Sequence, residues 1–183
     1  IIRDVRFSNN TFSNIENPIY APNNNFEQKL FNVTVTNNTF NRCTAGVELF
    51  CYLRNVEISN NNFLDLGSPL LQKQSNAIRL GNSRFDYHTD KEIGDFRIFN
   101  NRIMNVFCGQ YLKGREGYEC HGILVIGNRV EINGNHIENV YNGGVAGNPR
   151  IKTGSEGIYV KANDCRIYNN TLINAGFGEG AIS

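Results

Sequence analysis

Short stretches of alternating apolar and polar residues recur along the chain. The clearest examples are residues 33–35, 56–58, 96–98 and 130–132. Alternation with a period of two places every second side chain on one face of a β-strand, so one apolar row of each stretch points inward. The pattern predicts a chain of short β-strands, and we find no helical period of useful length.

A fragment of the form Asn-Asn-x-Phe follows each of these stretches, with Ile or Leu in some copies in place of Phe. The second asparagine is present in every copy, at Asn10, Asn38, Asn61, Asn101, Asn135 and Asn170. The spacings are 28, 23, 40, 34 and 35 residues. A base period near 23 residues with insertions accounts for all five, and such self-similarity is typical of a solenoid whose repeats stack on one another.

A second set of strands follows the longer connections. It comprises residues 45–50, 76–81, 121–126 and 156–161. We expect its inward row to consist of Val47 and Leu49, Ile78 and Leu80, Ile123 and Val125, and Ile158 and Val160. Each repeat would then contribute two strands to a shared core.

Asparagine is unusually abundant, at 30 of 183 residues. In a disordered, prion-like tract it would not keep a fixed place between apolar strands. In a stack of like on like, with neighbours ~4.8 Å apart, an asparagine at the same bend of each coil can bond to those above and below. Asparagine also tolerates the left-handed backbone of a tight bend. The pairs therefore predict a structural asparagine ladder.

Two rival architectures lack their signatures. A leucine-rich solenoid needs a fixed Leu-x-x-Leu-x-Leu frame, and a β-sandwich needs hairpins with tight Asn-Gly turns. The sequence instead predicts an all-β parallel β-helix of about six coils, as many as the copies of the motif. We expect one domain over residues 1–183, truncated at both ends from a longer helix, because both ends read as strands in mid-course.

Charge and cysteine content narrow the partners. The net charge is +1 and no apolar run approaches the ~20 residues that span a bilayer, so we expect neither nucleic acid nor membrane as partner. The five cysteines are odd in number and lack CxxC spacing, which argues against a zinc site or a full disulfide framework. Cys108 and Cys120 could clip a loop.

The expected long loops, at 64–75, 82–95, 104–120 and 138–155, all flank the second strand set. Long loops on one face of a solenoid usually mark the binding face. Parity predicts one outward column of Tyr20, Glu48, Arg79, Leu124 and Tyr159, a second of Pro22, Phe50, Gly81, Ile126 and Lys161, and Asn76, His121 and Glu156 at the strand entrances. These columns would form the floor of a groove.

A cationic and aromatic groove suits an anionic sugar chain, because Lys and Arg neutralise uronate carboxylates. The chemistry that fits is β-elimination, with Lys161 as the base and His121 or Tyr159 as proton donor. The carboxylate would be neutralised by Arg79, by Arg150 or by an arginine beyond residue 183. Substrate-binding residues in the loops would be Lys113, Arg115, Arg150 and Lys152. Beside this stands a simpler interpretation, in which Lys161 is a solvated surface residue and His121 caps a strand.

The Val-x-Ile-x-Asn-Asn-x-Phe coil resembles the repeats of the pectate-lyase-like superfamily over essentially the whole chain, which implies a right-handed parallel β-helix. Locally, Glu156-Gly-Ile-Tyr-Val-Lys161 followed by Asn169-Asn-Thr-Leu172 is similar to a stretch of the alginate lyase and chondroitinase B family. That resemblance implies calcium at Glu156 and a catalytic base at Lys161. The family's second metal-binding glutamate would fall at Gly154.

Three functions remain open. The first is an extracellular or secreted polysaccharide lyase that cleaves a uronate-containing chain. The second is a phage tailspike or other receptor-binding spike on a virion surface, often a homotrimer, that binds or hydrolyses a surface polysaccharide. Hydrolysis would need a carboxylate pair, for which the loop acids Asp86, Asp90, Glu92 and Asp95 are the candidates. The third is a purely structural or adhesive solenoid.

Overall fold

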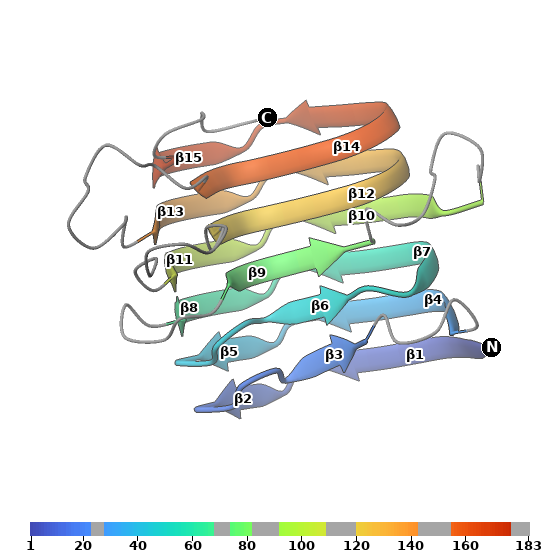
Figure 1. Ribbon diagram of the computed structural model, residues 1–183, viewed down its shortest axis with the longest axis horizontal. Coiled ribbons are helices and arrows are strands. Elements are labelled where there is room, and N and C mark those ends of the chain that lie inside the picture. The colour runs from blue at the N-terminus through green and yellow to red at the C-terminus, as the bar shows by residue number, and fades with distance from the viewer. Residues whose placement is uncertain (23–27, 68–73, 82–91, 109–119, 143–154, 177–183) are drawn as a thin grey trace, which may run out of the picture.

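The computed structural model describes residues 1–22, 28–67, 74–81, 92–108, 120–142 and 155–176. Within these residues the protein is all-β, with parallel strands in two curled sheets (Figure 1). No helix long and apolar enough to cross a membrane occurs in this part of the chain.

The smaller sheet has six strands in the order β15-β13-β11-β8-β5-β2. Its strands are β2 (Thr11–Ser13), β5 (Thr39–Asn41), β8 (Asn62–Gly67), β11 (Arg102–Cys108), β13 (His136–Asn142) and β15 (Thr171–Ala175). Each strand pairs in parallel with the strand one repeat away.

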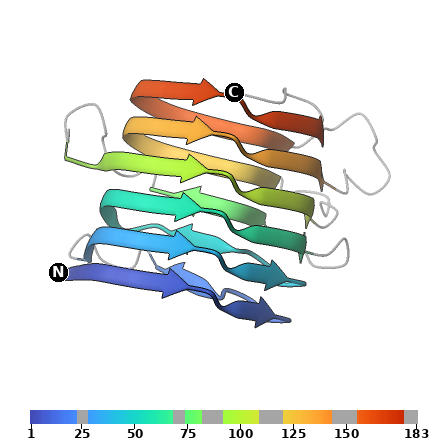
Figure 2. The ribbon, with the colours of Figure 1, turned by 180° about the vertical axis from the view of Figure 1, so that it is seen from behind.

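The larger sheet has nine strands and folds back on itself, because β12 (Cys120–Asn133) and β14 (Ser155–Tyr168) run through both of its halves. We call one half the front limb: the first parts of β12 and β14 with β3 (Ile19–Ala21), β6 (Val47–Leu49) and β9 (Ser75–Leu80). The other half is the rear limb: the second parts of β12 and β14 with β1 (Ile2–Ser8), β4 (Lys29–Thr36), β7 (Tyr52–Ser59) and β10 (Gly94–Phe99). Figure 2 shows the rear limb from behind.

The register confirms that equivalent residues of successive repeats share a column. Val35 pairs with Ile58, Ile58 with Ile98, and Ile98 with Ile132. All four side chains are buried. In the six-stranded sheet Phe40 and Phe63 stack face to face, with ring centroids 4.6 Å apart. The predicted inward row of the second strand set is also confirmed: its members are buried except Val160, which is half-buried against the core.

The bends follow a rule that the asparagine pairs reveal only in part. In the part of the chain that the structure describes, all 17 non-glycine residues with positive φ fall at three bends per repeat, five residues apart along the chain. They are Asp4, Asn9 and Asn14; Asn32, Asn37 and Arg42; Asn55, Asn60 and Asp65; Asp95, Asn100 and Asn105; Arg129 and Asn139; and Asp164, Asn169 and Asn174. The one gap in the series is filled by Gly134, also at positive φ. Fifteen of the 17 are Asn or Asp, the residues that enter the left-handed region most readily.

The second asparagine of each pair has a different task from the first. The asparagine row, as we call Asn10, Asn38, Asn61, Asn101, Asn135 and Asn170, is joined by side-chain hydrogen bonds of 2.9–3.1 Å from each Nδ2 to the next Oδ1. Each Oδ1 in this series also accepts from the backbone N–H of the preceding member. The predicted alignment along one axis is thus confirmed.

Two further expectations have clear outcomes. The predicted loops at 64–75, 82–95, 104–120 and 138–155 include residues that belong to strands. Strands β8, β11 and β13 continue beyond the third bend of their repeats, and β10 begins at Gly94. The suggested clip is confirmed: a disulfide joins Cys108, at the end of β11, to Cys120, at the start of β12.

Candidate functional site

The outward face of the front limb holds the columns predicted from the sequence. Tyr20 pairs with Glu48, Glu48 with Arg79, Arg79 with Leu124, and Leu124 with Tyr159. Because parallel neighbours lie ~4.8 Å apart, Arg79 and Tyr159 are separated by two strand spacings, roughly 10 Å. Of this column, Tyr20 is exposed, Arg79 and Tyr159 are half-buried, and Glu48 and Leu124 are buried.

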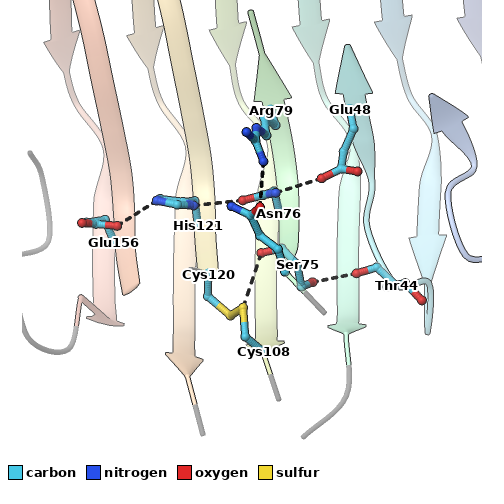
Figure 3. Close-up of a disulfide and its surroundings, with 10 residues drawn as sticks. Thr44, Glu48, Ser75, Asn76, Arg79, Cys108, Cys120, His121 and Glu156 are labelled. Atoms are coloured by element: carbon cyan, nitrogen blue, oxygen red, sulfur yellow. Dashed lines mark hydrogen bonds and ion pairs between the residues drawn. A yellow bond between two sulfur atoms is a disulfide. The ribbon is translucent and has the colours of Figure 1, made fainter. Parts of the chain in front are cut away.

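A buried chain of polar side chains runs across four of these strands (Figure 3). Asn76 Nδ2 donates to Glu48 Oε1 at 2.8 Å, and Asn76 Oδ1 lies 2.9 Å from His121 Nδ1. His121 Nε2 lies 2.9 Å from Glu156 Oε2. All four residues are at most 9% exposed. We call Glu48, Asn76, His121 and Glu156 the polar chain.

The order of donors along the polar chain follows from the Asn76 amide. Its Nδ2 group faces Glu48, so its oxygen faces His121. An amide oxygen only accepts, and Nδ1 of His121 therefore carries a proton and donates it. At the other end, Glu156 Oε2 lies 2.9 Å from His121 Nε2 but makes no hydrogen bond of standard geometry with the described residues.

Burial has a cost at Glu48. Removal from water raises the pKa of the Glu48 carboxyl, while the hydrogen bond from Asn76 and the charge of Arg79 lower it by less. A carboxyl in this position keeps its proton to higher pH than one in solvent. The polar chain therefore contains a carboxyl group, that of Glu48, whose pKa is raised by burial.

Two contacts between a cation and an aromatic ring lie beside the polar chain. The Lys161 Nζ atom is 5.4 Å from the centroid of the Tyr159 ring. The Arg79 guanidinium carbon is 4.4 Å from the Phe50 ring centroid, and Arg79 Nη1 donates to Gln74 Oε1 at 2.9 Å. We call Tyr20, Phe50, Arg79, Tyr159 and Lys161 the cationic–aromatic strip.

The predicted catalytic residues are thus near one another but differ in exposure. Lys161 is exposed, while Tyr159 and Arg79 are half-buried. His121 and Glu156 are each 2% exposed, and both His121 ring nitrogens already have partners. In this arrangement His121 cannot donate a proton directly to a sugar. The predicted substrate-binding residues Lys113, Arg115, Arg150 and Lys152 lie outside the described residues.

The structure offers no support for the predicted calcium site in the described part of the chain. Over those residues, no three His, Cys, Asp or Glu side chains are grouped so that they could hold an ion. Glu156 faces His121 instead. Its carboxylate is the partner of a buried imidazole.

The sequence interpretation missed a hollow on the rear limb, of about 450 Å³. It is lined by Asn55, Asp95, Arg97, Arg129, Val130, Glu131, Asp164, Cys165 and Arg166. The sequence signal was the residue after each strand's first apolar position, where Glu57, Arg97, Glu131 and Arg166 alternate in charge and share a column.

Several residues that line this hollow form ion pairs between neighbouring strands. Arg97 Nη2 lies 2.7 Å from Glu57 Oε2. Arg129 contacts Asp95 through two nitrogens, Nε–Oδ1 at 2.5 Å and Nη2–Oδ2 at 3.0 Å, and this pairing lowers the pKa of the Asp95 carboxyl. Partly exposed pairs of this kind stabilise a protein only modestly. Of the loop acids considered for hydrolysis, Asp95 is in such an ion pair and Glu92 accepts a hydrogen bond from the Tyr52 hydroxyl at 3.1 Å, while Asp86 and Asp90 lie outside the described residues.

No protein-family model, curated protein or solved structure matches this chain. Fold and site geometry therefore carry the functional argument.

Proposed function

We propose that the chain forms a right-handed parallel β-helix of about six coils, one for each copy of the asparagine motif, and that it belongs with the pectate-lyase-like proteins its repeats resemble. The parallel in-register strands and the hydrogen-bonded asparagine row support this assignment. An asparagine ladder of this kind satisfies buried amides only if every coil keeps the same register.

We further propose that the protein binds an anionic polysaccharide along the front limb and cleaves it by β-elimination. The observation that carries the proposal is the exposed Lys161 ammonium lying over the half-buried Tyr159 ring, at 5.4 Å from the ring centroid. The proton next to the uronate carboxylate and the leaving glycosidic oxygen are on adjacent carbons, so a base and a proton donor that contact each other can act on both. The disulfide fits secretion into an oxidising environment.

The step conserves atoms and electrons without water. Lys161, in its neutral form, removes the proton on the carbon next to the uronate carboxylate, and the resulting electron pair forms a carbon–carbon double bond. The glycosidic oxygen on the neighbouring carbon leaves and takes a proton from the Tyr159 hydroxyl. The products are a new non-reducing end with an unsaturated uronate and a new reducing end.

Arg79 has a supporting part in this proposal. It lies two strand spacings from Tyr159, roughly 10 Å along the stack, and its guanidinium contacts Phe50, which follows β6. Its guanidinium, held over Phe50, would pair with the carboxylate of another sugar in the same chain. The proposal uses no calcium at Glu156, because that carboxylate faces His121.

The experiment incubates the protein with alginate, pectate and chondroitin and measures the ultraviolet absorbance of unsaturated uronates. We expect cleavage of one of them, and Lys161→Met should lower the rate at least ~100-fold because it removes the base. Lys29→Met is the matched control: Lys29 also lies over a tyrosine ring, with Nζ 4.7 Å from the Tyr52 centroid, but on the rear limb.

Either of two results would reject the proposal. One is the absence of unsaturated product from all three polymers. The other is a rate in Lys161→Met that is no lower than in Lys29→Met, since that would show that Lys161 is not the base.

A further inference from the structure

The polar chain differs in kind from the asparagine row. The row repeats one residue, and every buried amide meets an identical partner. The polar chain instead places Glu48, Asn76, His121 and Glu156, four residues of three types, in buried positions on successive strands. Buried ionisable groups are costly and are weak evidence for stability. The presence of these ionisable groups beside the cationic–aromatic strip therefore needs an explanation other than stability.

The imidazole of His121 is fixed from both sides within the strand layer. Nδ1 contacts Asn76 Oδ1 and Nε2 contacts Glu156 Oε2, each at 2.9 Å, so the ring cannot turn without losing one of the contacts. The neighbouring disulfide holds Cys120, the residue before His121, to the end of β11. Cys108 Sγ in turn contacts the Ser75 carbonyl oxygen at 4.0 Å, one residue before Asn76 (Figure 3).

The fixed imidazole touches the proposed proton donor. The ring centroids of His121 and Tyr159 are 5.6 Å apart with an interplanar angle of 60°, an edge-to-face contact. The Lys161 ammonium lies over the same tyrosine ring. Tyr159 is thus in contact with a buried, immobile ring and with an exposed cation, and the buried ring is the one that can set its position.

We propose that His121 is a positioning residue that acts through Tyr159: Asn76 and Glu156 hold the imidazole, and the imidazole holds the phenol in the orientation needed to protonate the leaving oxygen. The catalytic half of this inference rests on the proposed lyase activity. The structural half, restriction of the Tyr159 ring, does not. The two halves can therefore be tested separately.

The structural test uses protein labelled with carbon-13 in its tyrosine rings, with the Tyr159 signals assigned through Tyr159→Phe. We expect the Tyr159 signals to shift and to show faster ring motion in His121→Gln. They should stay close to wild type in Glu156→Gln, because the glutamine amide can donate to Nε2 and keep the imidazole in place.

The matched control is His136→Gln. His136 also faces a glutamate, with Nε2 3.2 Å from Glu138 Oε2, but it is 40% exposed and lies in the six-stranded sheet. The Tyr159 signals should not respond to it. Circular dichroism and a melting curve establish that each variant is folded, and only folded variants are compared.

The kinetic test separates positioning from binding. On the polymer that the wild type cleaves, His121→Gln should lower kcat by roughly 100-fold with KM within twofold, as expected for a displaced catalytic group. Glu156→Gln should retain most of the wild-type kcat. Unchanged Tyr159 signals in folded His121→Gln overturn the inference, and so does an unchanged kcat. If no polymer is cleaved, the proposed function fails while the labelling experiment still decides the structural half.

Discussion

At the scale of single residues, the amide side chains of the asparagine row and the carboxyl side chains of Glu48 and Asp95 have different consequences for stability. Each amide of the asparagine row is satisfied by its neighbours whatever the pH. The carboxyl groups of Glu48 and Asp95 change their charge with pH, and their surroundings move their pKa values in opposite directions. Burial raises the pKa of Glu48, and the Arg129 hydrogen bond lowers the pKa of Asp95. Stability should therefore depend on pH through both.

Glu48→Gln tests the raised pKa of Glu48. The folded protein keeps this proton to higher pH than the unfolded chain, whose value is near 4.5, so stability falls as pH rises from there through the folded pKa. Glutamine does not titrate and can still accept from Asn76. We expect the free energy of unfolding, measured in urea at a series of pH values, to lose this decline in Glu48→Gln.

Asp95→Asn supplies a control of opposite sign. The folded pKa of Asp95 lies below the unfolded value of 3.8, so its stabilisation is present above that value and is lost as pH falls through the folded pKa. The substitution should weaken the rise of stability with pH in the acid range and leave the Glu48 decline in place. A Glu48→Gln protein with the wild-type pH profile would contradict the assignment.

At the scale of elements, the asparagine row ties each coil to the next at one bend. Asn101 shows how much each member contributes: its Nδ2 donates to Ile58 O, Phe99 O and Asn135 Oδ1, and its Oδ1 accepts from the backbone and side chain of Asn61. Removing this side chain takes a hydrogen bond from groups on three coils and leaves the buried Asn61 N–H without its acceptor.

We expect Asn101→Ala to lower the free energy of unfolding by roughly 3 kcal/mol, since a buried unsatisfied donor costs about 1–3 kcal/mol and each further lost hydrogen bond about 1 kcal/mol. Denaturant unfolding measures it. Asn10→Ala is the matched control, because Asn10 is exposed at one end of the row and should cost only about 1 kcal/mol. Equal losses in the two variants would mean that burial along the row does not determine its strength.

Sequence reasoning at this scale succeeded where a residue type repeats and failed where it varies. The row was predictable because asparagine recurs in every copy of the motif. The first and third bends were missed because Asp, Asn and Arg share them, as at Asp4, Asn32 and Arg42. What these positions share is a left-handed backbone, which a single residue motif does not express.

At the scale of the whole molecule, the stack is nearly one-dimensional, since each strand contacts mainly the equivalent strands of the neighbouring repeats. Burial declines toward both ends. β1 is largely exposed, and so are β15 and the second half of β14, whereas β9 and the first part of β12 are almost wholly buried. Local opening should follow this gradient.

Native-state hydrogen exchange, read by mass spectrometry of peptides, measures that gradient. We expect amides of β7, β9, β10 and β12 to exchange slowest and those of β1, β2 and β15 fastest, because opening an end coil exposes less apolar surface. Uniform protection over all fifteen strands of the described residues would indicate a single cooperative unit and would contradict the one-dimensional description.

The outward columns of the front limb show how far the sequence reaches toward the site. The predicted neighbours Glu48, Arg79, Leu124 and Tyr159 share a column, because strand parity and the repeat period fix them. Their exposure could not be read in the same way. Whether a side chain such as His121 faces a groove or lies under one depends on what covers the strand.

The sequence by itself determined the all-β stack, its register, the buried apolar rows and the alignment of the asparagines. These follow from periodicity, and a period is a property of one dimension that survives without coordinates. Only the tertiary structure decided that His121 and Glu156 are buried partners in one chain with Asn76 and Glu48, that both imidazole nitrogens are occupied, and that Lys161 remains exposed beside Tyr159. Such contacts join residues from different coils in three dimensions, where distance and burial are set by packing and not by spacing along the chain.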